Sequence, residues 1–170
     1  MKFLIPFLFC LTAYASEAPY SGQQMRSIKS LSDDQIQKYL DGAGMGLAKA
    51  AELNSYPGPK HVLELREQLE LTQEQEKKTR EIYEIMHKRA VELGNRVIEL
   101  ESKLDNDFSN KTISSAILQQ QLLEIGKVQA ELRFVHLRAH LDQKLLLTPH
   151  QIALYNHLRG YSSNSNHHLH

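Results

Sequence analysis

The chain has 170 residues, with 20 basic and 20 acidic side chains and a formal net charge of zero. This balance argues against a nucleic-acid-binding protein, which carries a basic stripe. The only cysteine is Cys10, so a mature chain without its first residues has neither disulfides nor a cysteine metal centre, and its core depends on apolar packing.

The N-terminal segment has the pattern of a secretory signal. Lys2 is positively charged, residues 3–11 are almost entirely apolar, and Ala13 and Ala15 are the small residues that signal peptidase reads. The apolar run is well below the roughly 20 residues that span a bilayer. We therefore expect residues 1–15 to be a cleaved signal peptide and the mature protein to be periplasmic, with no membrane span.

The segment after the signal predicts a leader followed by one domain. Residues 16–31 are polar and lack helical periodicity, which favours a flexible leader. Ser32 and Gln35 form a capping-box pair that starts a short helix. This helix opens a single helical domain over residues 32–160. Glycines weaken the helical pattern within residues 42–53, and the sequence leaves the role of that segment open.

Apolar periodicity in the rest of the chain predicts an all-α fold. One long helix is expected over about residues 73–105 and a second over about 113–146, with a polar turn between them. Short helices over about residues 60–70 and 149–159 flank this pair. The short connection makes the two long helices an antiparallel helical hairpin.

Two similar boxes open helices on either side of the hairpin. In each box a threonine caps the helix and a glutamine three residues later completes the capping box, so the motif serves the architecture. The residues of the two boxes are Leu71, Thr72, Gln75, Leu147, Thr148 and Gln151.

Two Leu-Thr-x-x-Gln boxes that flank a helical hairpin behind a signal peptide resemble the LTXXQ family. Members of this family include the periplasmic chaperones Spy and CpxP, and the metal-responsive proteins ZraP and CnrX are related. The resemblance covers about residues 60–160. It implies a Spy/CpxP-like homodimer of the envelope-stress or heavy-metal response that binds unfolded periplasmic proteins or an envelope sensor protein. The alternative is a dedicated periplasmic heavy-metal sensor or resistance protein.

Several histidines indicate a metal site. His136 and His140 are four residues apart, so both rings project from one face of a helix. If residue x faces about residue 218 minus x across the hairpin, then His61, Glu64 and His157 reach the same level from the short helices. Neutral imidazole favours Zn²⁺, Cu²⁺, Ni²⁺ or Co²⁺. The alternative is a solvated pair, or a hydrogen-bonded histidine within the apolar stripe of the helix.

The remaining histidines carry weaker expectations. His87 and His150 have the pattern of surface residues. Residues 161–170 form a polar tail that we expect to be disordered. Its three histidines either scavenge metal or remain solvated without a role.

The second long helix carries a further apolar stripe opposite its core-facing side. A helix in a small hairpin needs one buried face, so a second apolar face calls for a partner. The short helices pack on it, or a second copy covers it in a homodimer, or it binds unfolded clients. Its residues are Leu123, Phe134, Leu137, Leu141 and Leu145.

No catalytic motif occurs in the chain. The sequence lacks a Gly-x-Ser-x-Gly nucleophile turn, a phosphate-binding loop, a His-Glu-x-x-His pair and a Cys-x-x-Cys-His haem site. We therefore expect a binding protein and no enzyme, with a divalent transition metal as its one candidate cofactor.

Overall fold

The computed structural model describes residues 18–162. This part of the chain is all-helical, without a strand. In chain order the elements are η1 (Gln23–Met25), α1 (Asp33–Leu40), α2 (Lys49–Glu52), α3 (Pro59–Glu64), α4 (Gln73–Ser109), α5 (Ser115–Leu146) and α6 (Pro149–Leu158). The predicted signal peptide, residues 1–15, and the tail histidines His167, His168 and His170 lie outside the described residues.

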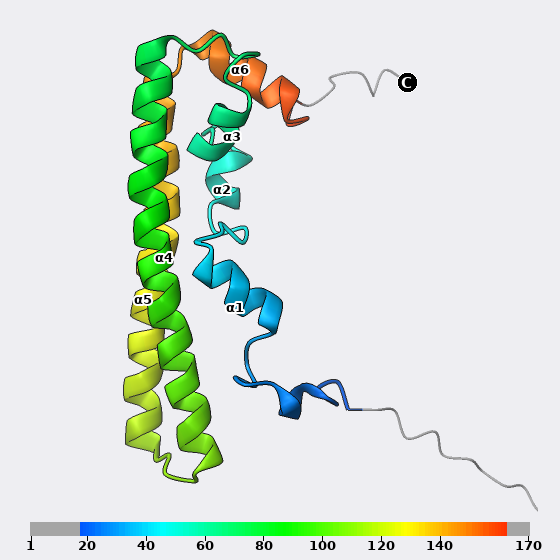
Figure 1. Cartoon of the computed structure of the whole chain (residues 1–170), viewed down its shortest axis with the longest axis vertical. Coiled ribbons are helices and arrows are strands. Elements are labelled where there is room, and N and C mark those ends of the chain that lie inside the picture. The colour runs from blue at the N-terminus through cyan, green and yellow to red at the C-terminus, as the bar shows by residue number, and fades with distance from the viewer. Residues whose placement is uncertain (1–17, 163–170) are drawn as a thin grey trace, which may run out of the picture.

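The predicted antiparallel pair of long helices is confirmed. Figure 1 shows α4 and α5 side by side, with α1, α2 and α3 along one flank and α6 at the open end of the hairpin. The core between the long helices is a ladder of buried apolar side chains from both. Its residues are Ala90, Leu93, Val97, Leu100, Ile125, Val128 and Leu132.

The first long helix runs four residues past its predicted end at residue 105 and stops at Ser109. The polar residues that predicted a turn stay helical because they are bonded to neighbouring segments. Asp107 accepts hydrogen bonds from Gln121 Nε2 at 2.6 Å and from Thr112 Oγ1 at 3.1 Å. The chain then reverses through Lys111, which has a left-handed backbone with φ of 58°.

The two predicted capping boxes are present, and they also bind each other. Thr72 and Thr148 each accept from the backbone amide of the glutamine three residues later. Gln75 Nε2 donates to Gln151 Oε1 at 2.9 Å and to Leu146 O at 2.8 Å. The four Thr and Gln side chains, here called the capping clamp, therefore join the starts of α4 and α6 at the open end of the hairpin.

The helix predicted over residues 60–70 is shorter than expected, because α3 ends at Glu64. The chain continues in turns to Glu70, whose φ of 47° is left-handed and redirects it into α4. A helical continuation would carry Leu69 away from the second core cluster. In that cluster it packs with Val62, Leu147 and Tyr155.

Residues 28–58, here called the arm, lie along the hairpin. Ile28 and Leu31 are buried, and Lys29 Nζ pairs with Asp105 at 2.9 Å. The packed domain therefore begins within the segment that was predicted to be a leader, residues 16–31, because two apolar side chains in it reach the hairpin. The predicted capping box of Ser32 is present at the start of α1.

The arm passes very close to α4 at Gly94. A Cβ at this position would lie 2.3 Å from the carbonyl oxygen of Tyr39, so only glycine admits α1 at this depth. Tyr39 and Leu47 from the arm pack against the hairpin core. Among the described residues, none of the helices combines the length and the apolar character that crossing a bilayer requires.

Candidate functional site

The arm and the half of the hairpin nearer its open end line a cleft of about 790 Å³. Its volume is in the range of ligand-binding clefts in proteins. Four histidines line it, and Glu52 forms part of its wall. We call it the histidine cleft and define it by His61, His87, His136 and His140.

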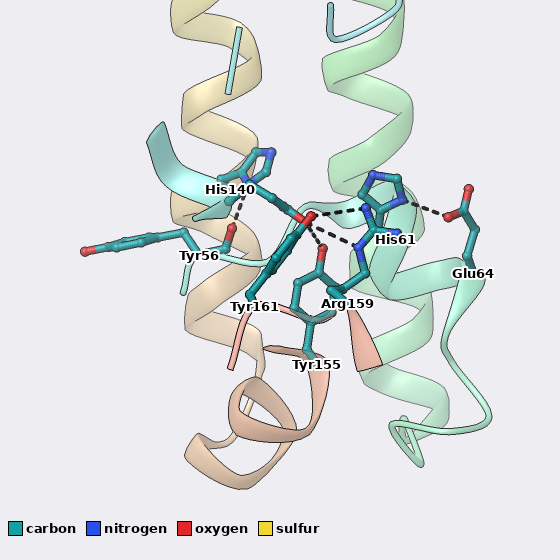
Figure 2. A network of polar contacts seen from close by, with 8 residues as sticks. Tyr56, His61, Glu64, His140, Tyr155, Arg159 and Tyr161 are labelled. Atoms are coloured by element: carbon teal, nitrogen blue, oxygen red, sulfur yellow. Dashed lines mark hydrogen bonds and ion pairs between the residues drawn. The ribbon is translucent and has the colours of Figure 1, made fainter. Parts of the chain in front are cut away.

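His140 is held by the arm. Its Nδ1 donates a hydrogen bond to the backbone carbonyl of Tyr56 at 2.7 Å (Figure 2). This bond places the proton on Nδ1 and leaves Nε2 with a free lone pair. The arm passes so close that a Cβ at Gly58 would lie 2.8 Å from His140 Cε1. A larger residue at Gly58 would therefore have to displace the His140 imidazole.

His136 is buried, with 5% of its surface exposed, and its Nε2 has no hydrogen-bond partner within the described chain. Burial, together with the neighbouring His140 and His87, lowers the pKa of His136 to about 4. The ring is therefore neutral at pH 7. A neutral imidazole with an unpaired nitrogen is a potential metal ligand, and it is also a destabilising buried polar group if it stays unpaired.

Glu52 connects the cleft to α6. Its Oε1 accepts a hydrogen bond from the Tyr155 hydroxyl at 2.5 Å, and Arg159 Nε lies 3.7 Å from the same oxygen (Figure 2). Its Oε2 lies 3.6 Å from His140 Nδ1. Burial and then the hydrogen bond to Glu52 raise the pKa of Tyr155. The carboxylate thus links the arm to the end of the hairpin that carries the capping clamp.

Three of the five predicted metal ligands lie in the cleft, and two do not. His61, His136 and His140 line it. Glu64 is directed to His61, whose Nδ1 lies 2.8 Å from Glu64 Oε2, and this bond lowers the pKa of Glu64 (Figure 2). His157 is exposed on α6 and is absent from the cleft lining.

Within residues 18–162, no three histidine, aspartate or glutamate side chains are arranged to hold one metal ion. The cleft therefore brings three histidines of the predicted layer, His61, His136 and His140, together but not to a common point. The level of His136 and His140 follows from the pairing of the two long helices. The direction of each ring depends on the arm, which the sequence did not place.

Two residues of the cleft were not predicted from the sequence. His87 was predicted to be a surface residue, but its Nε2 donates to the backbone carbonyl of Asp41 at 3.1 Å and its ring lines the cleft. Glu52 was not considered. Neither carries a spacing signal, because their role depends on where the arm crosses the hairpin.

The second apolar stripe of α5 is exposed. Phe134 is 62% exposed and Leu145 is 84% exposed, while Leu137 is half-buried. Of the three alternatives for this stripe, packing of the short helices applies at most to one end, where Tyr56 and Ile152 lie beside Leu141 and Leu145. We call the surface the outer stripe and define it as Leu123, Phe134, Leu137, Leu141 and Leu145.

The outer stripe lies on the side of α5 that faces away from the hairpin core. The buried residues of α5 lie about 120 to 200° around the helix from Phe134, at 100° per residue. Beside Phe134, a shallow groove of about 190 Å³ runs between α4 and α5 and is lined by Ile82, Ile85 and Val135. An apolar row with a groove at its centre is typical of a protein-binding surface.

Comparison with known proteins gives no relative for this chain. No family model, no curated protein sequence and no solved structure matches it. The resemblance to the LTXXQ family therefore rests on the two boxes and the hairpin between them.

Proposed function

We propose that the protein is an exported, periplasmic helical-hairpin protein that holds unfolded protein segments in the envelope-stress or heavy-metal response. The observation that carries this proposal is the outer stripe. Its large apolar side chains point away from the hairpin core, and Leu123, Phe134 and Leu145 remain largely exposed. The signal-like N-terminus and the Leu-Thr-x-x-Gln boxes support the compartment and the response.

The outer stripe has the chemistry that recognition of unfolded chains requires. Unfolded segments expose scattered apolar side chains and have no fixed shape, so a row of leucines and one phenylalanine on a rigid helix binds them without demanding complementarity. Charged side chains border the row on one edge, among them Arg138 and Asp142, which pair at 2.8 Å. This border keeps a bound complex soluble.

Binding of reduced, carboxymethylated α-lactalbumin, which is permanently unfolded, tests the proposal. The change Leu141→Ser with Leu145→Ser should weaken binding by at least about tenfold, because each leucine loses about 1.5 to 3 kcal/mol of burial. Leu122→Ser is the matched control, since Leu122 is exposed on α5 but about 120° away from Phe134. Equal binding by the wild-type protein and both variants would contradict the proposal, and so would binding to none of them.

Export is tested separately. Fusion of residues 1–20 to a reporter that is active only outside the cytoplasm should give activity, and the same fusion with Leu4→Arg and Leu8→Arg should not, because charges destroy the apolar run of a signal. Reporter activity that does not depend on these leucines would contradict export by this segment.

A second candidate function, binding of a divalent transition metal in the histidine cleft, is favoured by a specific observation. His140 donates from Nδ1 to Tyr56 O, and His61 Nδ1 is held by Glu64. Orientation by a carbonyl or carboxylate at the far nitrogen is how proteins commonly fix metal-binding histidines. His136 adds a neutral ring with an unpaired nitrogen.

Titration calorimetry with Zn²⁺, Cu²⁺, Ni²⁺ and Co²⁺ tests this candidate. The chain used should carry asparagine at His167, His168 and His170, so that the tail does not contribute. His136→Ala and His140→Ala should each reduce affinity by at least about tenfold, and His157→Ala should leave it unchanged because His157 lies outside the cleft. Heats that are the same in all three variants would remove the candidate.

A further inference from the structure

The imidazoles of the histidine cleft are numerous but do not converge. Four histidines line the cleft, yet among the described residues no three side chains of histidine, aspartate or glutamate surround one point. A bare divalent ion commonly takes about three or four protein ligands. The iron of a porphyrin receives four nitrogens from the ring itself, so one or two axial ligands suffice. We infer that the cleft binds an iron porphyrin, with His140 and His61 as the axial ligands.

Two of the four histidines present a nitrogen in the way that an axial ligand requires. His140 donates from Nδ1 to Tyr56 O at 2.7 Å, and His61 Nδ1 lies 2.8 Å from the Glu64 carboxylate. Each bond fixes the ring and leaves Nε2 free to bind iron. The two residues belong to α5 and α3, and Figure 2 shows their rings on opposite sides of the site. A flat ligand between them therefore meets one imidazole on each face.

The other two histidines are less suited to this role. His136 is only 5% exposed, and His87 uses its Nε2 in the bond to Asp41 O. The side chains of His140 and His61 are 12% and 34% exposed, so both can be reached from the cleft. Accessibility and orientation therefore select the same pair.

Glycines keep the arm side of the cleft open. Gly58 lies opposite His140, and a Cβ at this position would stand 3.1 Å from His140 Nε2. A side chain there would enter the space that an axial bond needs. Four of the eight glycines in the chain line the cleft, namely Gly42, Gly44, Gly46 and Gly58.

Gly44 is the glycine that the fold itself does not explain. Its φ is not positive, and the nearest atom to a Cβ at this position would be His136 Nδ1 at 4.0 Å. Neither backbone conformation nor packing within the described residues therefore requires a glycine here. Close approach of a flat ligand to the backbone does require one.

The rest of the lining suits the plate and the acidic groups of a porphyrin. The volume of about 790 Å³ lies within the range of ligand clefts, roughly 300 to 1,000 Å³. Lys49, Lys60 and Arg159 supply positive charge on the cleft wall, which is complementary to the two propionates. The apolar part of the wall includes Met45, Tyr83, Met86, Ala139 and Tyr161. Because the chain has no Cys-x-x-Cys-His motif, axial bonds and packing alone would hold the ligand.

The inference goes beyond both candidate functions, since it concerns neither unfolded clients nor a bare metal ion. Spectroscopic titration with haemin tests it. The chain used should carry asparagine at the three histidines of the tail, so that the tail supplies no ligand. We expect one haemin per chain, a shifted Soret band and the spectrum of low-spin, six-coordinate ferric iron.

Histidine variants test the two axial bonds. His140→Ala should weaken haemin binding by at least about tenfold. His61→Ala should retain haemin but give the spectrum of five-coordinate, high-spin iron. His157→Ala is the matched control and should behave as the wild type, because His157 lies outside the cleft. Added imidazole should restore the low-spin spectrum of His140→Gly, which shows that the fold of such a variant is intact.

Two further variants test the cleft without removing a histidine. Gly44→Leu should weaken haemin binding by at least about tenfold and leave the helical circular dichroism unchanged, because the leucine fills space that the fold does not use. Lys49→Glu with Lys60→Glu should weaken binding of haemin but not of its dimethyl ester, whose acidic groups carry no charge.

An unshifted Soret band, a shift that is equal in His140→Ala and the wild-type chain, or a shift that is lost in Leu141→Ser with Leu145→Ser would each overturn the inference. The last result would place haemin on the outer stripe. A six-coordinate spectrum in His61→Ala would overturn the assignment of the second axial ligand. Haemin binding by a chain that binds none of the four bare ions would support the inference and remove the divalent-metal candidate.

Discussion

The two long faces of the hairpin differ in what covers them. The face of α5 towards α4 and the arm includes polar side chains such as His136 and Gln143, and yet both are buried. The outer stripe carries Phe134 and Leu145, and yet both are exposed. Burial on α5 is therefore decided by where α4 and the arm cover it as well as by the hydropathy of each residue. A helix that is apolar on two sides needs both sides buried, and within the described residues only one side of α5 is buried in full.

The difference between the two faces is tested most sharply by truncating one leucine on each face to alanine. Leu132→Ala, on the buried side of α5, should lower the free energy of unfolding by about 3 kcal/mol, because it leaves a cavity in the hairpin core. Leu145→Ala should change it by less than about 0.5 kcal/mol in a monomer. Urea denaturation at low protein concentration measures both. Similar losses in the two variants would show that the outer stripe is covered within one chain.

The buried histidine makes the arm-covered face sensitive to acid. The pKa of His136 is about 4 in the folded protein and about 6.5 when unfolded, so the unfolded chain binds more protons between these values. Stability should therefore fall as the pH drops from 6.5 to 4, by about 2 to 3 kcal/mol from this group. His136→Leu should remove this part of the pH dependence and leave that of the carboxylates.

Comparing urea unfolding of the wild-type protein and His136→Leu at pH 7 and pH 4 isolates the contribution of the histidine. At pH 7 the leucine variant should be at least as stable as the wild type, because it removes an unpaired buried nitrogen. Parallel pH profiles for the two proteins would mean that His136 is solvated in the native state.

The capping clamp is the polar contact that we expect to matter most at the open end of the hairpin. Gln151→Ala removes its bonds to Leu69 O and Gln75 and frees the amide of Thr148. The expected loss is about 2 kcal/mol, because buried backbone groups remain unpaired. Gln119→Ala, at an exposed position of α5, should cost less than about 0.5 kcal/mol. Thermal unfolding that gives equal midpoints for the two variants would contradict the role of the clamp.

The hairpin was predictable because its signals are local. Capping boxes and apolar periodicity depend on residues within a few positions of each other, so they fixed the helix starts at Gln73 and Pro149 correctly. The predicted facing rule was also close. Thr79 bonds to Gln143 and Arg96 to Glu124, so residue x faces about residue 220 to 222 minus x, against the predicted 218.

The histidine cleft was only partly predictable because it depends on long-range packing. His136 and His140 were found from their helical spacing. His87 was missed because it lies in the cleft only where the arm carbonyl of Asp41 reaches it. The approach of Tyr39 to Gly94 sets this crossing, and no local pattern announces a contact between residues so far apart in sequence.

Alanine substitutions at the two glycines of the long helices should have the smallest effects on the free energy of unfolding, and the two effects should have opposite signs. Gly94 faces the arm, where a Cβ would meet the carbonyl oxygen of Tyr39, whereas Gly126 has no atom within 4 Å of its Cβ position. Alanine favours a helix by about 1 kcal/mol over glycine, so Gly126→Ala should stabilise the protein by about 0.5 to 1 kcal/mol. Gly94→Ala gains the same preference but forces the arm outward, which costs about 1 to 3 kcal/mol.

The net effect of Gly94→Ala is therefore a loss of about 1 kcal/mol, and it should be confined to the arm. Hydrogen exchange should speed up in α1, whose docking depends on this glycine, while exchange in α4 and α5 stays slow because their shared core is unchanged. Gly126→Ala should slow exchange in α5 and leave the arm as it is. If Gly94→Ala instead stabilised the protein as Gly126→Ala does, the arm would not be seated on α4 in solution. The histidine cleft, which exists only beneath the arm, would then be open to solvent.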